Sequence, residues 1–376
     1  MARNISNRLQ GLRVRRSGMD RLDRVAMESM ASVVAKSRLN EAWQARAKDQ
    51  PYTRYAIGAM EAVDADYTRI SLETARRIGN QLLTALREDF SIDFRLQGSV
   101  PLDVHIRGVS DVDLLNLDVS FFTYRTDGPR SRLSGYSNPT TKTSLGVLSS
   151  LRKASASALR KAFPAADVDT SGSKAIKISG GSLARPVDVV PSHWHDSVQY
   201  QASGNEVERS VTILDSKNDT TLENFPFMHI SRVRQRCDQT GGGLRKGIRL
   251  VKNVKADAIA EGTSVALPSF DIAAIMYHAD LNALSAGRFH ELAILAETQR
   301  HFDYLATHHE YAKTLSVPDG SRLIFDVPGK LTALNNLSIE LDDLAREVAK
   351  EQNAMYRLIE PSLPQSRAAI EKAYIA

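Results

Sequence analysis

The sequence predicts an α+β protein in which a mixed sheet with helices packs against a C-terminal helical domain. Short apolar runs bounded by turn residues lie between residues 92 and 190, and such runs are typical of strands. From Leu222 onward the apolar residues recur at helical spacing instead. A chain of 376 residues is also too long for one typical compact core. We therefore expect two closely packed units.

The region before the first strand is expected to be largely helical. Residues 1–17 show no clear periodicity and are expected to be irregular, whereas the pattern over 20–47 predicts a helix that ends before Pro51. A long amphipathic helix is expected over 56–87, because its apolar residues follow helical spacing: Met60, Val63, Tyr67, Ile70, Ile78, Leu82 and Leu86.

The remaining elements follow from the same patterns. Strands are expected over 92–96, 111–121, 168–178 and 187–190, with a loop over 123–143 and a helix over 144–163. Further helices are expected over 244–260, 270–285, 290–315, 330–353 and 366–375. We accordingly divide the chain into a basic N-terminal helical arm (1–54), a unit that contains the sheet (55–215) and a helical unit (216–376).

Composition and charge restrict the class of protein. No stretch approaches the roughly 20 apolar residues of a membrane span, and the N-terminus has no apolar core of a signal peptide. Cys237 is the only cysteine, so no internal disulfide forms, and we expect a cytoplasmic protein. Residues 1–50 contain eleven Lys and Arg against five Asp and Glu. This arm could bind nucleic acid, but a solvated helix face is the favoured interpretation.

Three aspartates form the most informative pattern. Asp111 and Asp113 are two residues apart in a predicted strand, so their side chains point to the same side. Asp188 lies in a second apolar strand, 187–190, and if the two strands are neighbours the three carboxylates converge. Like charges in one buried site need a cation, and oxygen ligands favour Mg²⁺. Two such ions, about 4 Å apart, can hold the attacking and leaving oxygens of a phosphoryl displacement.

Gly98 and Ser99 follow the strand 92–96 and form a turn that suits phosphate binding. Glycine lets the backbone approach a ligand closely, and the following N–H groups and the Ser99 hydroxyl can bind phosphate oxygens. An isolated Gly-Ser pair is usually an ordinary turn, and an isolated Asp-x-Asp is more often an exposed pair. Their combination, with a third aspartate strand, favours a site for nucleotidyl transfer.

Two features of the helical unit are candidates for phosphate contact. Arg245, Arg249 and Lys252 lie on one face of the predicted helix 244–260. This face is either a solvated basic stripe or the cationic wall opposite the carboxylates. Ser269 opens the next helix after Pro268, where a hydroxyl can cap the helix or reach a phosphate, and the two roles are compatible.

His193 and His195 flank Trp194 just beyond the third aspartate. Their spacing resembles a metal-binding pair, but a zinc site is disfavoured. We expect packing by Trp194, or a lip over the bound nucleotide, instead.

These motifs together resemble a known family. Gly98-Ser99, Asp111-Val112-Asp113 and Val187-Asp188-Val189-Val190-Pro191 resemble the DNA-polymerase-β-like nucleotidyltransferases. Residues 247–252, 267–270, 276–278 and 317–321 look like the helical half of the CD-NTases, which are cGAS/DncV-like bacterial nucleotidyltransferases. The resemblance covers about residues 55–345. It implies a polymerase-β-like core packed on an oligoadenylate-synthase-like helical domain that completes the nucleotide cleft.

The resemblance also implies roles for individual residues. Asp111, Asp113 and Asp188 would be catalytic and bind two Mg²⁺ ions, for which Mn²⁺ can substitute. The nucleotide would be bound by Gly98, Ser99, Lys252 and Ser269. The family joins ATP or other nucleoside triphosphates into cyclic di- or trinucleotides and releases pyrophosphate. These products are second messengers of bacterial antiphage (CBASS) signalling, so the implied partners are a separate effector and a regulatory protein.

Other functions share the same motifs. A template-independent nucleotidyltransferase acting on RNA or protein, or a linear oligonucleotide synthase, would use the same three aspartates. A non-catalytic nucleotide sensor is a third class. The presence of all three carboxylates argues against it, because an inactive copy could lose them without penalty. The acceptor of the nucleotidyl group distinguishes the enzymes from one another.

Overall fold

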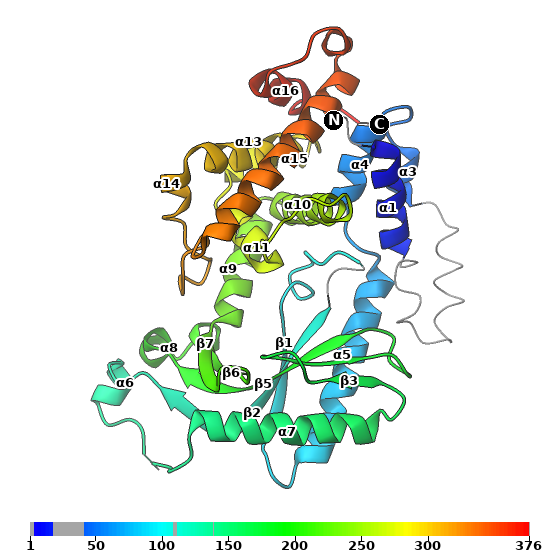
Figure 1. The fold of residues 1–376 in the computed structure, drawn as a ribbon. Coiled ribbons are helices and arrows are strands. Elements are labelled where there is room, and N and C mark those ends of the chain that lie inside the picture. Colours follow the sequence, from blue (N-terminus) through cyan, green and yellow to red (C-terminus); the bar gives the residue numbers. More distant parts are fainter. Residues whose placement is uncertain (1–3, 18–40, 108–110, 138, 376) are drawn as a thin grey trace.

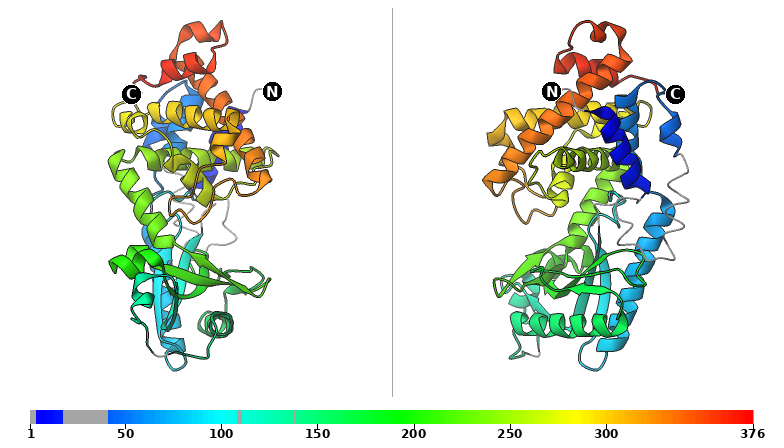
Figure 2. Two further views of the ribbon diagram at one scale, coloured as in Figure 1. Left: turned by 90° about the vertical axis from the view of Figure 1, so that its left-hand side faces the viewer. Right: turned by 45° about the vertical axis from the view of Figure 1, so that its right-hand side comes forward.

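A sheet with helices forms one half of the molecule and a cluster of helices forms the other (Figure 1). The computed structural model describes residues 4–17, 41–107, 111–137 and 139–375. Both termini lie at the helical end, and the two further views show the same division into halves (Figure 2). The predicted α+β class is therefore confirmed.

The sheet has seven strands in a mixed arrangement. Its main order is β1-β2-β5-β4-β3, and β6 pairs with β5 and β7. Among the strand pairs of the described residues, only β2 and β5 are parallel. β4 and β6 pair with successive stretches of β5. The strands are β1 (Ile92–Gln97), β2 (Val112–Tyr124), β3 (Asp167–Asp169), β4 (Ile176–Ser179), β5 (Val187–Asp196), β6 (Ser210–Asp215) and β7 (Thr220–Asn224).

Helices α5 (Ala65–Leu86) and α7 (Ser144–Ala162) cover one face of the sheet. Their apolar sides and alternate residues of the strands form one buried core, to which β2 and β5 contribute Val112, Leu114, Val187 and Val189. Because side chains alternate along a strand, the residues between these four point to the opposite face. There a smaller cluster, which includes Leu115 and Val190, packs toward Phe227 of α9 (Pro226–Gln239).

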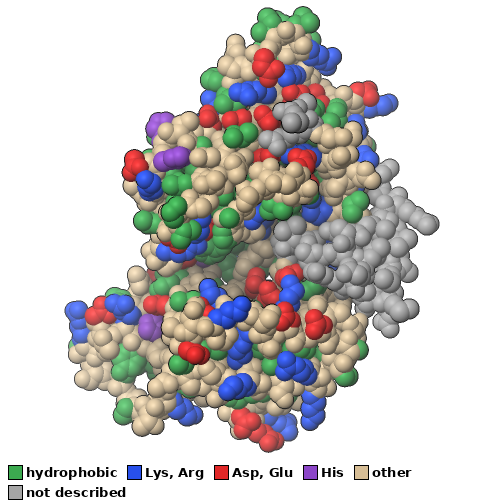
Figure 3. Space-filling view, in the orientation of Figure 1, with side chains coloured by type: hydrophobic (Ala, Val, Ile, Leu, Met, Phe, Trp, Pro, Cys, Tyr) green, Lys and Arg blue, Asp and Glu red, His purple; other side chains and the backbone are tan. Residues whose placement is uncertain are grey.

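The helical half is built around α10 (Gly243–Ala260). It packs against α4 (Pro51–Met60), α11 (Ser269–Tyr277), α13 (Ala293–Thr307) and α15 (Pro328–Gln352), which share its core. Figure 3 shows the surface hollowed between this half and the sheet half. The remaining helices are α1 (Ile5–Ser17), α3 (Ala42–Ala45), α6 (Pro129–Arg132), α8 (Val198–Ser203), η2 (Glu206–Glu208), α12 (Leu281–Ala286), α14 (His309–Ala312), η3 (Ala354–Arg357) and α16 (Leu363–Ile370).

Several predicted elements are corrected in the N-terminal region. Residues 5–17, expected to be irregular, form α1. The helix expected over 56–87 is two helices, because α4 ends at Met60 and the side chain of Asp64 caps a new helix by accepting a hydrogen bond from the Asp66 N–H. Most of the helix expected over 20–47 lies outside the described residues, and 42–45 form α3.

Other corrections concern longer segments. The strand expected over 168–178 is the antiparallel pair β3 and β4, and the loop over 123–143 contains the short helix α6. Two of the expected helices, 270–285 and 290–315, are each divided in two, giving α11 with α12 and α13 with α14. The β6–β7 hairpin crosses residue 215, so the sheet continues to Asn224. The three-part domain division stays a prediction.

Three arginines of α1 bind acidic groups of the protein itself. Arg8 pairs with Glu261 and Glu340, and Arg16 pairs with Glu41. Arg15 donates two hydrogen bonds to Asp257, at 2.9 and 3.1 Å. These contacts account for part of the positive charge of the basic arm, and they fasten α1 to the helical half.

No helix in the described ranges is both long and apolar enough to cross a membrane.

The ion pair between Arg15 and Asp257 gives a first prediction. Asp257 is 4% exposed and also accepts a hydrogen bond from the hydroxyl of Tyr55. Replacing Arg15 by glutamine leaves this carboxylate without its cation, so we expect the free energy of unfolding in urea to fall by roughly 3 kcal/mol. The exposed neighbour Arg13 is the matched control, and Arg13→Gln should change stability by less than about 0.5 kcal/mol. Equal losses in both variants would contradict this interpretation.

Candidate active site

Asp113 and Asp188 lie directly opposite each other on the two parallel strands. In the register of β2 and β5, Val112 pairs with Val187 and Asp113 pairs with Asp188. The valines belong to the core under α5 and α7, so the two aspartates project from the other face of the sheet. The sequence alternation therefore places both carboxylates on the face that is turned away from these two helices.

Asp111 and Lys177 complete this group. Asp111 directly precedes β2 and forms an ion pair with the ammonium of Lys177. Lys177 stands on β4, where its register partner is Asp188 of β5. Three carboxylates and one ammonium therefore meet across three adjacent strands.

The carboxylates raise each other's affinity for protons. Burial, followed by the charges of Asp188 and Asp111, raises the pKa of Asp113 to about 7. Burial and the charge of Asp111 also raise the pKa of Asp188. A bound cation would oppose both effects, because positive charge favours the ionised form. The donor set, three carboxylates that repel one another, thus fits a hard divalent cation.

The three side chains do not form a closed metal site on their own. Within the described ranges no three acidic, histidine or cysteine side chains are grouped tightly enough to hold an ion. Asp111 is instead turned to Lys177. A metal ion bound at this position would have to share Asp111 with that ammonium or displace it.

Gly98 lies in the turn after β1, directly beside Asp113. Its φ is +78°, which glycine adopts without strain. A Cβ at this position would overlap the Oδ2 of Asp113. The next residue, Ser99, accepts a hydrogen bond from the Val104 N–H through its carbonyl oxygen, at 3.1 Å. The turn and the carboxylate therefore occupy adjoining space.

This close approach predicts a large effect for Gly98→Ala. The added methyl group must displace the Asp113 carboxylate or the turn, and the positive φ adds strain. We expect nucleotidyl transfer to fall by at least about a hundredfold, because misplacing a reacting group by about 1 Å costs that much. Product formation and thermal unfolding would be measured together. Gly262→Ala is the matched control, since Gly262 also has a positive φ but its Cβ would meet nothing.

The basic face of α10 holds the loop that follows Gly98 and Ser99. Arg245 donates to the carbonyl of Leu102, at 3.1 Å, and Arg249 donates to that of Asp103, at 2.8 Å. Lys252 donates to the carbonyl of Val104, also at 2.8 Å, and its burial lowers its pKa to about 7. The three cations are therefore not a solvated stripe. They connect the helical half to the turn beside the carboxylates.

The predicted site residues come from both halves of the molecule. The structure gathers Gly98 and the three aspartates on the sheet half, with Lys252 entering from α10. Ser99 follows Gly98 in the same turn. Ser269 is the first residue of α11 in the helical half and is partly exposed. The contacts of Ser99, Lys252 and Ser269 with a triphosphate remain predictions.

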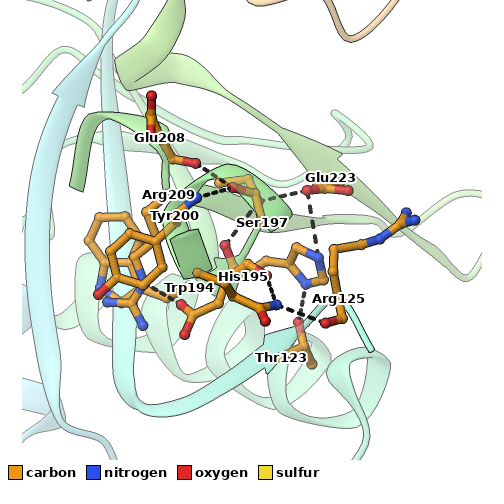
Figure 4. A network of polar contacts seen from close by, with 12 residues as sticks. Thr123, Arg125, Trp194, His195, Ser197, Tyr200, Glu208, Arg209 and Glu223 are labelled. Atoms are coloured by element: carbon orange, nitrogen blue, oxygen red, sulfur yellow. Dashed lines mark hydrogen bonds and ion pairs between the residues drawn. The ribbon is translucent and has the colours of Figure 1, made fainter. Parts of the chain in front are cut away.

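His195 belongs to a network of polar contacts beyond the carboxylates, next to Trp194. The imidazole of His195 lies 2.7 Å from the Thr123 hydroxyl and 3.6 Å from the Glu223 carboxylate (Figure 4). Arg209 lies over the ring of Trp194 and pairs with Asp196 at 2.6 Å. These contacts pack Trp194 among polar groups at the far end of β5, as the packing interpretation expects.

The sequence did not predict a group of residues that lies where the chain enters β2 and β5, the two strands of the aspartates. The guanidinium groups of Arg107 and Arg185 lie over the ring of Tyr67, at 4.8 and 4.2 Å. Arg107 precedes β2 in the chain and Arg185 precedes β5, so Tyr67 of α5 connects the approaches to Asp111 and Asp188. Lys177 was missed as well. Its only local signal is a charged residue between two buried isoleucines.

A mixed sheet with this carboxylate site, facing a helical half, defines the nucleotidyltransferase class. No family model matches the chain. The chain is 43% identical over 357 residues to a cyclic dinucleotide synthase CdnE from Yersinia aleksiciae, with 92% of each chain covered. It is 29% identical over 309 residues to a c-di-GMP synthase from a Lachnospiraceae bacterium, with 77% of this chain and 86% of that one covered.

A solved structure has the same fold. The STING-associated CdnE c-di-GMP synthase from Capnocytophaga granulosa superposes with a TM-score of 0.68 at 24% identity, over 91% of this chain and 97% of that chain. With the Yersinia relative covered almost end to end, the chain belongs to the CD-NTase family of cyclic oligonucleotide synthases. The resemblance stated from the motifs is confirmed, and the enzyme is a nucleotidyltransferase.

Proposed function

We propose that this enzyme joins two nucleoside triphosphates into a cyclic dinucleotide, with GTP as the first candidate substrate and c-di-GMP as the first candidate product. The direct opposition of Asp113 and Asp188 on parallel strands, beside Asp111, carries the proposal. The relatives that are c-di-GMP synthases support the choice of GTP. In the cell, the product would act as an antiphage (CBASS) signal to a separate effector in the cytoplasm, with a regulatory protein controlling synthesis.

The proposed metal site follows from the carboxylates. Asp111, Asp113 and Asp188 would hold two Mg²⁺ ions, or Mn²⁺ in their place. When bound, the ions would neutralise charge on the phosphates and on the attacking hydroxyl. Burial and the charges of Asp188 and Asp111 raise the pKa of Asp113, and a shared cation would offset these effects, which supports this assignment.

The chain's own residues would bind and orient the nucleotide. Gly98 leaves room beside Asp113, so backbone N–H groups of the turn can approach the donor phosphates. Ser99 would add its hydroxyl. Lys252 holds the same loop through the Val104 carbonyl and would direct positive charge to the triphosphate tail, with Ser269 contributing from the start of α11.

The test is direct product analysis. The purified protein is incubated with ATP, GTP, CTP and UTP, singly and together, with Mg²⁺ or Mn²⁺. The products are treated with phosphatase and resolved by mass spectrometry. A phosphatase-resistant cyclic dinucleotide from GTP alone is the expected result. A cyclic product with other bases would correct the substrate but keep the class.

The alternatives are separated by the same assay. Linear products that phosphatase shortens would indicate a linear oligonucleotide synthase. Incorporation of label into added RNA or protein, without a free cyclic product, would indicate a macromolecular acceptor and contradict the proposal.

A further inference from the structure

Lys177 is placed among the carboxylates by the sheet itself. Its neighbours Ile176 and Ile178 are buried in the core under α5 and α7, so the Lys177 side chain points to the opposite face. The antiparallel register with β5 sets it opposite Asp188. Its ammonium pairs with Asp111, and its charge also acts on Asp113 and Asp188.

This ammonium lies among the carboxylates that would hold a divalent cation. Asp111 is one of the three carboxylates suited to hold the ion, and Lys177 already neutralises it. An ion bound to Asp111 would lie next to this ammonium, and two positive charges so close repel each other. The two charges compete for one carboxylate, so each lowers the affinity of the site for the other.

The ion pair is accessible enough to open. The Lys177 side chain is 37% exposed and that of Asp111 is 18% exposed. A pair of this exposure is worth much less than a fully buried pair, and the ammonium can return to water when it is displaced. Nucleoside triphosphate brings new anionic oxygens to the site, and these give the displaced ammonium a partner.

We propose that Lys177 competes with a divalent cation for Asp111, so that the nucleotide-free site binds the cation weakly and binds it firmly only together with nucleoside triphosphate. This inference rests on the proposed function of the three aspartates. It makes Lys177 a residue that couples metal binding to substrate binding. The effect of Lys177 on metal binding can be measured without catalytic turnover.

The experiment measures Mn²⁺ binding by electron paramagnetic resonance on the full-length protein without nucleotide. Lys177→Met removes the competing charge and should tighten Mn²⁺ binding by about three- to tenfold, as the loss of one partly exposed ion pair predicts. Lys177→Arg keeps the charge and should bind Mn²⁺ like the wild type. Lys174→Met is the matched control, since Lys174 is an exposed lysine on the same hairpin.

A second measurement adds a non-hydrolysable GTP analogue. The gain in Mn²⁺ affinity on adding the analogue should be larger for the wild type than for Lys177→Met, by the same factor. Equal or weaker Mn²⁺ binding by Lys177→Met, or no Mn²⁺ binding by any variant, would overturn the inference. Circular dichroism and thermal unfolding of each variant establish that it is folded.

The proposed function fails on different evidence. If the wild type makes no cyclic product while Lys177→Met still binds Mn²⁺ more tightly, the competition stands and the proposed product is wrong. If the wild type makes the product and Mn²⁺ affinity is the same in all variants, the function stands and the competition is wrong.

Discussion

Replacing Asp113 by asparagine is expected to abolish cyclic dinucleotide synthesis while the protein stays folded. Asp113 is the central carboxylate, since it faces Asp188 across the parallel strands and feels the charges of both other aspartates. If Asp113 binds metal as proposed, its loss removes several kcal/mol of transition-state stabilisation, so the rate should fall by at least about a thousandfold. The rate of product formation would be followed by mass spectrometry at saturating nucleotide and Mg²⁺.

The same substitution should leave the metal-free protein as stable as the wild type, or more stable. Asparagine is close to the shape of aspartate, and it removes a charge that its neighbours repel. Thermal unfolding would be measured in EDTA. Asp93→Asn on the adjacent strand β1 is the matched control, because Asp93 is a partly exposed carboxylate paired with Arg95 and should have little effect on either readout. Activity that persists in Asp113→Asn would show that the site is elsewhere.

The strand pattern predicts the face of each carboxylate but not the partner strand. Alternation of apolar residues in 111–121 and 187–190 correctly implies that Asp113 and Asp188 leave the core side of their strands. That β2 and β5 are neighbours, with Asp113 opposite Asp188, depends on long-range pairing. No local periodicity contains that information. The sequence therefore predicts that the carboxylates converge only on the condition that the two strands are neighbours.

Helix α1 shows why the N-terminal region could not be predicted. Its sequence has no clear apolar face, and its helical propensity alone is marginal for thirteen residues. Leu9 and Leu12 are buried in the core of the helical half. Ion pairs with residues far along the chain, such as Arg8 with Glu261 and Arg15 with Asp257, also hold the helix. Tertiary contacts of this kind override local pattern.

The basic face of α10 shows the opposite case, in which the local pattern was predicted correctly but its contacts were not. Spacing alone correctly grouped Arg245, Arg249 and Lys252 on one side of a helix, yet it could not say what they touch. The structure directs all three to carbonyl groups of the loop 102–104. A cationic stripe that looks like a ligand surface in sequence thus first satisfies the backbone of a neighbouring turn.

Buried histidines should make the protein unstable in mild acid. Burial lowers the pKa of four histidines to about 4: His105, His193, His229 and His301. Their ordinary pKa in an unfolded chain is near 6.5. Between these values the unfolded chain binds protons that the folded protein does not, so the stability that these groups contribute is fully present above pH 6.5 and is lost as the pH falls toward 4.

The free energy of unfolding is expected to depend steeply on pH in this range. Each histidine contributes roughly 1.4 kcal/mol per pH unit, and Asp113, whose pKa is raised to about 7, opposes them because the folded protein binds its proton more tightly. In the metal-free protein the free energy of unfolding should therefore fall by roughly 4 kcal/mol per pH unit near pH 5.5. Urea unfolding at several pH values, in EDTA, measures this directly.

Two variants test whether buried histidines cause the pH dependence of the free energy of unfolding. His229→Leu removes one of the four and should make the pH dependence shallower by roughly 1.4 kcal/mol per pH unit, whatever it costs in stability at pH 7. His308→Gln replaces an exposed histidine at the end of α13 and should leave the slope unchanged. A slope that is the same in all three proteins would mean that His229 is protonated without unfolding, and that the acid sensitivity has another origin.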